Sequence, residues 1–381
     1  MSKTTRRIKS PDALISLDYG GSATKSLYTR VDGRRETEFL GMEPYTAQVS
    51  QVSIENYQNS KLGCANPEDA AWVAVGDVYY AVGRLARTEF GADEALDELK
   101  YERAVEKTLA AIWVIQQRLK LDAKFSIALA VVLPPSEYQD RDKFKRDLKD
   151  ALANYLTPTA RLSVTLDSFT CRQEGSGIYM CHRQAQGEAL KKRVCALVML
   201  GYRNASILVA ERGEVKTSRV AISHLGFYQM IKMVHHQTSG LSTHRLAPAI
   251  CAAGVAIKRE ALRPLLRSRR SRHIEEELAQ IVTAIRESRL EYSKKLIDWI
   301  DSKLPVDVEE LVFAGGTADY LAKELSQHYA HLRLSWNADT KVPEFIDTEG
   351  YGNRILDVLG VYLNAKKQLN KQLRAMELET V

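Results

Sequence analysis

The sequence lacks the cysteine patterns that indicate a disulfide framework or a structural zinc site. Its cysteines are odd in number, widely spaced and free of CxxC pairs. They are Cys64, Cys171, Cys181, Cys195 and Cys251. A reducing compartment is the simplest setting for such a chain. We therefore expect a cytoplasmic protein.

Long hydrophobic runs and a strong excess of one charge are also missing. The longest apolar run, residues 125–133, is far shorter than the roughly 20 residues of a spanning helix. The polar and basic residues 1–11 are not typical of a secretory signal, and we interpret them as a disordered tail. We expect no transmembrane segment. The formal charge of +6, from 54 basic and 48 acidic residues, permits an acidic partner without requiring one.

What is present suits an ordinary globular protein with a substantial core. Hydrophobic residues make up 45% of the chain and charged residues 27%. A length of 381 residues favours two domains over one.

The most informative stretch is LISLDYGGSATKSLY, residues 14–28. An apolar strand ends at Asp18 and turns through Gly20, Gly21 and Ser22 toward Lys25. Glycines let a loop approach an anion closely and direct several backbone N–H groups at it, as phosphate-binding loops do. A carboxylate at the strand end could hold a hydrated cation. These residues predict a phosphate site.

The segment after this loop excludes a dinucleotide fold or a P-loop, because both continue into a helix. Residues 25–31 alternate like a strand, Asp32-Gly33 predicts a hairpin turn, and residues 34–40 look extended. A three-stranded meander is expected. A second one begins at Val194, with a glycine turn at residues 201–204. The repetition predicts two similar domains, with a nucleotide touching both loops.

Further elements complete the expected organisation. A short strand is expected at residues 161–166, and Glu174 follows it just before a Gly-Ser-Gly turn. A long amphipathic helix is expected over residues 274–304, and a terminal helix over residues 350–373. Between them, a strand at residues 310–314 runs into Gly315-Gly316-Thr317, where bare backbone could lie against a flat ligand group.

The basic run Arg263–His273 allows two interpretations. Charge runs usually form a solvated helix end or loop. Alternatively, this run contacts an acidic partner, such as a neighbouring subunit, an anionic lipid or nucleic acid. The sequence leaves both open.

In this order and spacing the motifs resemble the actin-like ATPase superfamily, in particular its plasmid-segregation (ParM-type) branch. Asp18, Gly20 and Lys25 match the first phosphate motif, and LVFAGGTADYL matches the adenosine motif. The resemblance implies an α/β fold of the actin-like, duplicated ribonuclease H-like type, with a nucleotide cleft between its domains. Domain I would span residues 12–192 and be completed by the helix 350–373, and domain II would span residues 193–349.

The resemblance also implies a role for each matched residue. Asp18 would organise Mg²⁺ through water, and Lys25 would neutralise the phosphates of ATP or GTP. Glu174 would position or activate the attacking water. The remaining nucleotide-binding residues would be the first phosphate loop, the second phosphate loop and the adenosine motif: Gly20, Gly21, Ser22 and Ala23; Gly201, Tyr202 and Asn204; Gly315, Gly316 and Thr317.

One position departs from the pattern. Met199 stands where the second phosphate loop of the superfamily begins with an aspartate. A thioether cannot bind magnesium or orient water as a carboxylate does. Losing the aspartate would lower the rate of hydrolysis by about a hundredfold or more. We therefore expect nucleotide binding with slow hydrolysis, in a weak ATPase.

The expected function is a bacterial filament that assembles with ATP. Its task would be plasmid segregation with a DNA-binding adaptor protein, or a derived cytoskeletal role. The alternative is a non-polymerising ATP-binding scaffold that docks a membrane or DNA partner through the basic run. A small-molecule kinase of the same superfamily ranks below both.

Overall fold

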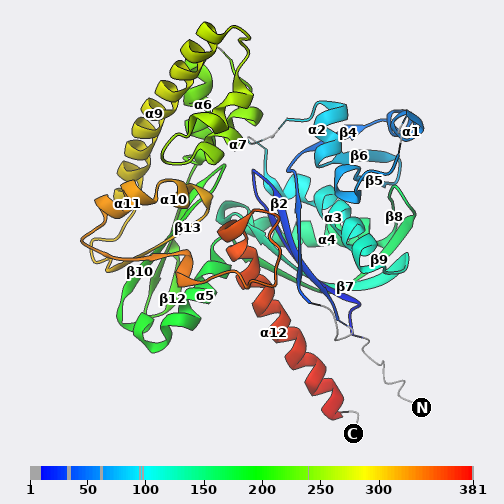
Figure 1. Ribbon diagram of the computed structural model, residues 1–381. Coiled ribbons are helices and arrows are strands. Elements are labelled where there is room, and N and C mark those ends of the chain that lie inside the picture. The colour runs from blue at the N-terminus through cyan, green and yellow to red at the C-terminus, as the bar shows by residue number, and fades with distance from the viewer. Residues whose placement is uncertain are drawn as a thin grey trace, which may run out of the picture. The chain divides into compact units, whose positions relative to one another are not determined.

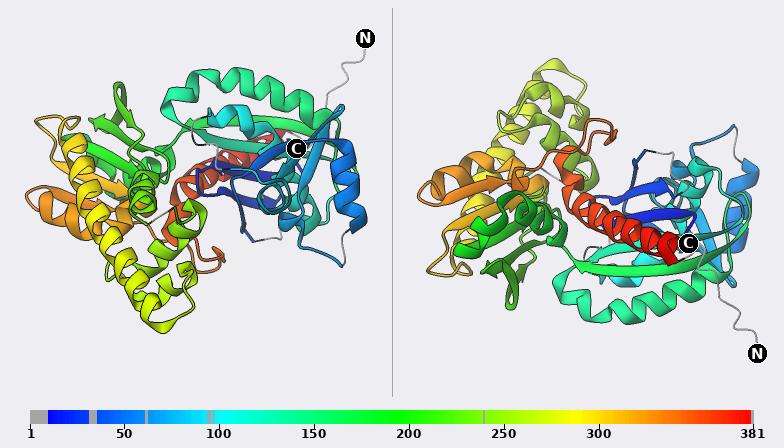
Figure 2. Two further views of the ribbon diagram at one scale, coloured as in Figure 1. Left: turned by 90° about the horizontal axis from the view of Figure 1, so that it is seen from above. Right: turned by 90° about the horizontal axis from the view of Figure 1, so that it is seen from below.

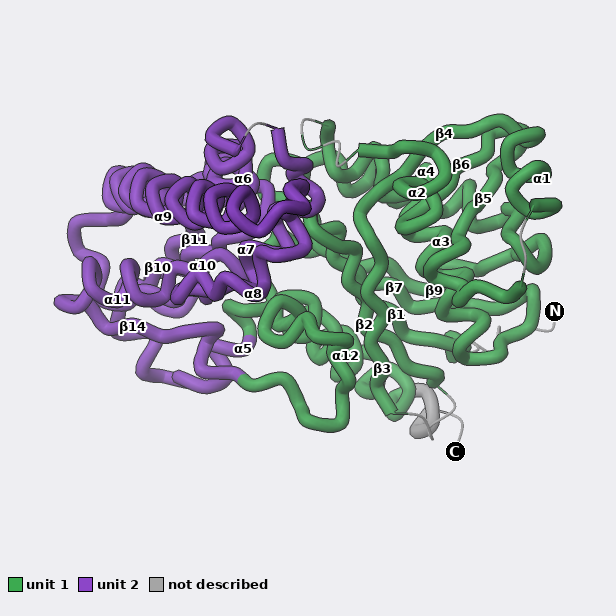
Figure 3. The backbone as a smooth tube through the Cα atoms, turned by 45° about the horizontal axis from the view of Figure 1, so that its top comes forward, with its two compact units in different colours: residues 1–180, 341–381 green, residues 181–340 purple. Residues whose placement is uncertain are grey.

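The computed structural model describes residues 10–31, 36–60, 63–93, 96, 98–238 and 240–379. The expected Asp32-Gly33 turn and residues 1–9 of the expected tail lie outside this part of the chain. The fold divides into two compact units (Figure 3). Unit 1 comprises residues 1–180 and 341–381, and unit 2 comprises residues 181–340. The domain limits expected at residues 192 and 349 stay a prediction.

Unit 1 is built on a nine-stranded sheet with the order β3-β2-β1-β7-β9-β8-β5-β6-β4 (Figure 1). The strands are β1 (Ala13–Tyr19), β2 (Thr24–Arg30), β3 (Glu38–Met42), β4 (Thr46–Val49), β5 (Trp72–Val75), β6 (Val78–Val82), β7 (Lys124–Leu133), β8 (Tyr155–Leu156) and β9 (Arg161–Gln173). Strands β1, β2 and β3 pair antiparallel, which confirms the first meander. Strands β7 and β9 continue the sheet in parallel from β1.

One strand of unit 1 is longer than the sequence predicted. The strand expected at residues 161–166 continues as β9 to Gln173, because its whole second half pairs with β7 up to Leu133. Polar residues such as Asp167 and Arg172 hide this continuation from a hydrophobicity pattern. Its consequence is that Glu174 stands directly at the carboxyl end of a sheet strand.

Unit 2 repeats the central part of this sheet with five strands. Their order is β12-β11-β10-β13-β14. They are β10 (Val194–Leu200), β11 (Ala205–Glu211), β12 (Glu214–Ser223), β13 (Glu310–Ala314) and β14 (Arg333–Trp336). The first three pair antiparallel, which confirms the second meander, and β13 and β14 follow in parallel. Order and direction match β3-β2-β1-β7-β9, so the two units share one core topology.

Helices cover both faces of the unit 1 sheet. They are α1 (Gln51–Ser60), α2 (Arg84–Phe90), α3 (Ala104–Leu119), α4 (Arg141–Ala153), the start of α5 (Ser176–Gln186) and α12 (Leu356–Glu379), with short 3-10 turns at Lys100–Arg103 and Gly352–Ile355. Alternate residues of β1 and β7 pack against α3 and α4. On the opposite face Ala130 and Val132 pack against Val361 of α12. Figure 2 shows α12, in red, beside the blue strands of this sheet.

The terminal helix begins later than the expected residue 350. Gly350 and Gly352 have φ values of 82° and 52°, in the left-handed region that a helix cannot use. The regular helix α12 therefore starts only at Leu356. This places Asp357 in its first turn.

The helices of unit 2 are α6 (Phe227–Gln237), α7 (Thr243–Ala253), α8 (Arg259–Leu262), α9 (Ser271–Asp301), α10 (Gly316–Tyr320) and α11 (Ala322–His328). The long helix α9 confirms the expected amphipathic helix, but it begins and ends earlier than the expected residues 274 and 304. Its expected apolar residues, Leu278, Ile281, Ile285, Tyr292, Leu296 and Ile300, are all buried.

Among the described residues, no helix combines the length and the apolar character needed to cross a bilayer.

Candidate functional site

The first phosphate motif forms a tight hairpin in unit 1. Asp18 and Lys25 are direct partners across the pair β1–β2. Their charged atoms, Asp18 Oδ2 and Lys25 Nζ, lie 2.5 Å apart, and the two side chains are only 5% and 11% exposed. Lys25 also donates to the carbonyl oxygen of Arg354 at 3.0 Å. A carboxylate and an ammonium are thus fixed together at one end of the sheet.

The four residues between β1 and β2 offer backbone donors to a ligand. Within the part of the chain that the structure describes, the N–H groups of residues 20–23 donate to no protein acceptor. A Cβ at Gly20 would lie 2.8 Å from the carbonyl oxygen of Ala23, so this turn needs glycine. Consecutive unpaired N–H groups beside a lysine favour an anion such as phosphate. The residues of this loop therefore fit the phosphates of a nucleotide.

Glu174 follows β9 and lies beside a lysine that sequence reasoning missed. Its carboxylate pairs with Lys100, and both side chains are largely buried, at 13% and 10% exposed. Burial alone would lower the pKa of Lys100, but the carboxylates of Glu174 and Asp18 outweigh it and the pKa is raised. No motif surrounds Lys100, which is 74 residues from Glu174. The unit 1 fold therefore brings Asp18, Lys25 and Glu174 into one charged cluster.

Arg354, just before α12, and Asp357, in its first turn, also contact this cluster. Sequence reasoning missed both residues. The guanidinium of Arg354 donates to Ser22 Oγ at 2.7 Å. The carboxylate of Asp357 accepts the N–H groups of Gly175, Gly177 and Ile178. Burial, together with the nearby carboxylates of Asp18 and Glu174, raises the pKa of Asp357 from 3.8 to about 7, against the lowering effect of the Gly175 and Ile178 N–H groups.

In unit 2 the fold joins the second phosphate loop to the adenosine motif. The hydroxyl of Thr317 donates to the carbonyl oxygen of Gly201 at 2.9 Å. Gly201 itself donates its N–H to the carbonyl of Asn204, which closes the turn after β10. The side-chain Oδ1 of Asn204 is buried and accepts no hydrogen bond from the described residues. A buried oxygen without a donor is what a ligand or its bound water would satisfy.

The glycine pair of the adenosine motif allows a close backbone contact. Gly315 has φ 97° and ψ 157°, a conformation essentially restricted to glycine. A Cβ there would lie only 2.4 Å from the carbonyl oxygen of Leu200. The end of β13 can therefore pass the end of β10 only if residue 315 has no side chain.

Met199 and Tyr202 frame the second phosphate loop. Met199 is partly exposed near the end of β10, between Ser206 of β11 and Ala314 of β13. The Tyr202 ring packs against Tyr228 with the ring centroids 5.8 Å apart. The Met199 position is thus beside the end of the β13 strand that leads into Gly315.

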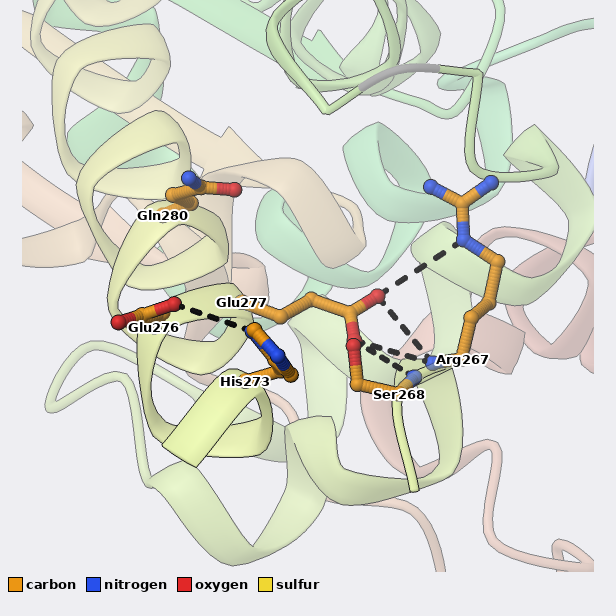
Figure 4. Close-up of a pocket in the computed structure, with 6 residues that line it drawn as sticks. All are labelled: Arg267, Ser268, His273, Glu276, Glu277 and Gln280. Atoms are coloured by element: carbon orange, nitrogen blue, oxygen red, sulfur yellow. Dashed lines mark hydrogen bonds and ion pairs between the residues drawn. The ribbon is translucent and has the colours of Figure 1, made fainter. Parts of the chain in front are cut away.

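The basic run Arg263–His273 lies where α9 begins, next to several glutamates of that helix. A pocket there is lined by Arg267, Ser268, His273, Glu276, Glu277 and Gln280 (Figure 4). Glu277 accepts the N–H groups of Arg267 and Ser268. Arg272 pairs with Glu276 at 3.1 Å, and Arg259, just before the run, with Glu275 at 2.8 Å. Two of the five arginines of the run, Arg267 and Arg272, therefore have glutamate partners within the unit.

A second buried cluster lies elsewhere in unit 2. His182, Cys195 and Glu310 place possible metal-binding atoms within 4.8 Å of one another. However, Glu310 already accepts from Arg193 at 2.9 Å and lies 3.2 Å from Arg333 Nε. Burial raises the pKa of Cys195 to about 12, which keeps it a neutral thiol. We interpret this cluster as an ion-pair network that anchors the start of β13.

The fold is the one found in actin-like proteins such as ParM. No family model and no curated relative matches the chain. Among solved structures it is similar to a 15-stranded ParM filament from Clostridium botulinum, with TM-score 0.62, 14% identity, and 94% of this chain and 99% of that chain covered.

Two further structures agree. One is the apo ParM protein of pSK41, with TM-score 0.58, 12% identity and coverage of 94% and 98%. The other is Ta0583, an archaeal actin homolog in complex with ADP, with TM-score 0.54, 12% identity and coverage of 93% and 99%. At these identities the likeness establishes the fold, and the expected actin-like fold class is confirmed.

Proposed function

We propose that this chain is a bacterial, cytoplasmic actin-like protein that binds ATP with Mg²⁺ and assembles into filaments. The observation that carries the proposal is the β1–β2 hairpin, where Asp18, Lys25 and the unpaired N–H groups of residues 20–23 meet in an actin-like fold. Similar folds are known as a ParM filament and as a complex with ADP.

In this proposal the unit 1 residues bind the phosphates. The N–H groups of residues 20–23 donate to the β- and γ-phosphates, and Lys25 balances their charge. Asp18 holds Mg²⁺ through water, and the ion supplies neutralisation of the phosphate charge. Unit 2 contributes Gly315, Gly316 and Thr317 to adenosine, and Gly201, Tyr202 and Asn204 to the remaining phosphate contacts. The unsatisfied Oδ1 of Asn204 supports that assignment.

We further propose that hydrolysis is slow. Glu174 orients the attacking water, and Lys100 holds its carboxylate in place. The second loop offers Met199 where a carboxylate would assist, so transition-state stabilisation is reduced. A slowly hydrolysing protein would form long-lived filaments, because nucleotide state controls assembly in such a scheme.

We favour filament assembly over the scaffold alternative because arginines of the basic run are partly paired within unit 2. Docking an anionic membrane or DNA needs a net positive surface, yet two of the five arginines of the run, Arg267 and Arg272, and the neighbouring Arg259 already pair with glutamates of α9, which reduces that surface. A head-to-tail interface between copies needs no such surface. A DNA-binding adaptor and a role in plasmid segregation belong to the same proposal, with a cytoskeletal role as its variant.

Electron microscopy and light scattering of the purified chain test the proposal. Samples contain Mg²⁺ with ATP, with GTP, or without nucleotide. The double variant Asp18→Asn/Lys25→Gln keeps a hydrogen-bonding pair and the net charge but removes both charged groups, so it should not assemble. Lys149→Met, on the exposed face of α4, is the matched control and should assemble normally. Filaments that form equally in the double variant would refute the assigned site.

A further inference from the structure

The helix α5, which follows Glu174, is capped by a residue far away in sequence. The first N–H groups of a helix have no partner within it. Here those of Gly177 and Ile178 donate to Asp357 Oδ1 at 2.8 Å and 3.2 Å. The second oxygen, Asp357 Oδ2, accepts the N–H of Gly175 at 2.8 Å. Both carboxylate oxygens are therefore occupied by the loop that carries Glu174.

Close backbone contacts hold the same two segments together. A Cβ at Gly177 would lie 1.8 Å from the carbonyl oxygen of Asp357. A Cβ at Gly360 would lie 2.2 Å from the carbonyl oxygen of Gly177. Neither glycine needs a left-handed conformation, so each is required for space alone. The position of the Glu174 loop is thus set by α12 as well as by its own strand.

The turn just before α12 contacts the β1–β2 hairpin, which is called the phosphate hairpin below because it carries the proposed phosphate loop. The carbonyl oxygen of Arg354 accepts from Lys25 Nζ at 3.0 Å, and its guanidinium donates to Ser22 Oγ at 2.7 Å. One short stretch of chain, residues 354–357, therefore contacts both the phosphate hairpin and the Glu174 loop. All of these contacts lie within unit 1.

We propose that Asp357 is a positioning residue that holds Glu174 at a fixed distance from the phosphate hairpin, an inference that rests on the proposed ATPase function. Asp357 acts through the N–H groups of Gly175 and Gly177 and does not itself touch the nucleotide. Lys100 fixes the Glu174 carboxylate, and Asp357 fixes the backbone that carries it. Misplacing a catalytic group by about 1 Å can lower a rate by about a hundredfold.

The test compares turnover with binding in Asp357→Asn. An asparagine keeps the volume but turns one acceptor into a donor that faces an N–H group. We expect kcat for ATP to fall about tenfold or more, whereas the Kd of a non-hydrolysable ATP analogue changes less than about threefold. Asp12→Asn is the matched control, because Asp12 also accepts a backbone N–H in unit 1, from Ser126 at 2.8 Å, at the other end of β1.

A double-variant cycle with Glu174→Ala separates positioning from general damage. If Asp357 acts through Glu174, Asp357→Asn should slow Glu174→Ala no further. The same fold loss in both backgrounds, or no loss in either, would overturn the proposal. Wild-type turnover that Glu174→Ala leaves unchanged would instead refute the assigned role of Glu174.

Hydrogen exchange decides the inference even if turnover proves too slow to measure. Amides of residues 174–178 should exchange at least about tenfold faster in Asp357→Asn than in the wild type, and not in Asp12→Asn. Unchanged exchange in that segment would overturn the positioning role, whatever the protein hydrolyses.

Discussion

Replacing Gly315 by alanine should destabilise unit 2 through two separable effects. Gly315 has φ 97° and ψ 157°, and holding a residue with a side chain in that region costs about 1–3 kcal/mol. The new Cβ would also lie 2.4 Å from the carbonyl oxygen of Leu200 and 3.0 Å from its carbonyl carbon. Relieving such overpacking costs about 1–3 kcal/mol more. We expect a total loss of about 4 kcal/mol in the free energy of unfolding.

Gly254→Ala provides the matched control for the backbone effect. Gly254, at the end of α7 in the same unit, has φ 62° and ψ −163°, so it also needs glycine. Nothing lies within 4 Å of a Cβ placed there. Its substitution should therefore carry only the conformational cost, about 1–3 kcal/mol.

Urea titration followed by circular dichroism measures both variants against the wild type. The difference between them isolates the clash with Leu200. Because that carbonyl precedes Gly201, Gly315→Ala should also weaken the proposed ATP binding, whereas Gly254→Ala should not. Equal midpoints for the two variants would show that the contact between β10 and β13 tolerates a methyl group, and would refute the reasoning.

Three further predictions concern unit 1 and the second phosphate loop. Met199→Asp should raise phosphate release by about tenfold or more, because the partly exposed end of β10 can carry a carboxylate, and an unchanged rate would contradict the explanation for slow hydrolysis. Lys100→Met leaves Glu174 buried without its partner, so it should lower stability by about 3 kcal/mol in thermal melts, and Glu174→Gln in the same background should restore part of the loss. The pKa of Asp357, raised from 3.8 to about 7, means that the folded protein binds a proton that the unfolded chain releases. Its contribution therefore falls as the pH rises from about 4 to 7, by about 4 kcal/mol, and is constant above pH 7. Asp357→Asn should flatten that part of the stability profile of the nucleotide-free protein, and a profile of unchanged slope would contradict the assignment.

The sequence located the strands of both meanders well, because glycine turns bound each apolar run. The second meander was expected to begin at Val194 and to turn at residues 201–204, and β10 and β11 have those limits. The strand expected at residues 310–314 is β13. The β1–β2 hairpin could be predicted equally well, since Asp18 and Lys25 are close in sequence and meet across a single turn. Local signals suffice where the contacts themselves are local.

The residues that sequence reasoning missed act over long separations. Lys100 lies 74 residues from Glu174, and Asp357 lies 182 residues from Gly175. Neither stands in a local pattern that would distinguish it from a surface charge. The late start of α12 was also missed, because the apolar spacing extends through Gly350 and Gly352 while their backbone conformation does not allow a helix.

The discontinuity of unit 1 has a consequence for how the protein is made. Residues 341–381 complete a unit whose other residues precede Cys181. The whole of unit 2 is therefore synthesised before unit 1 can finish folding. Until α12 emerges, the apolar face at Ala130 and Val132 has no cover, and the Glu174 loop has no Asp357. A nascent chain therefore completes the β1–β2 hairpin and its contacts with residues 354–357 only after unit 2 has been made, which would keep unfinished copies out of the proposed filaments.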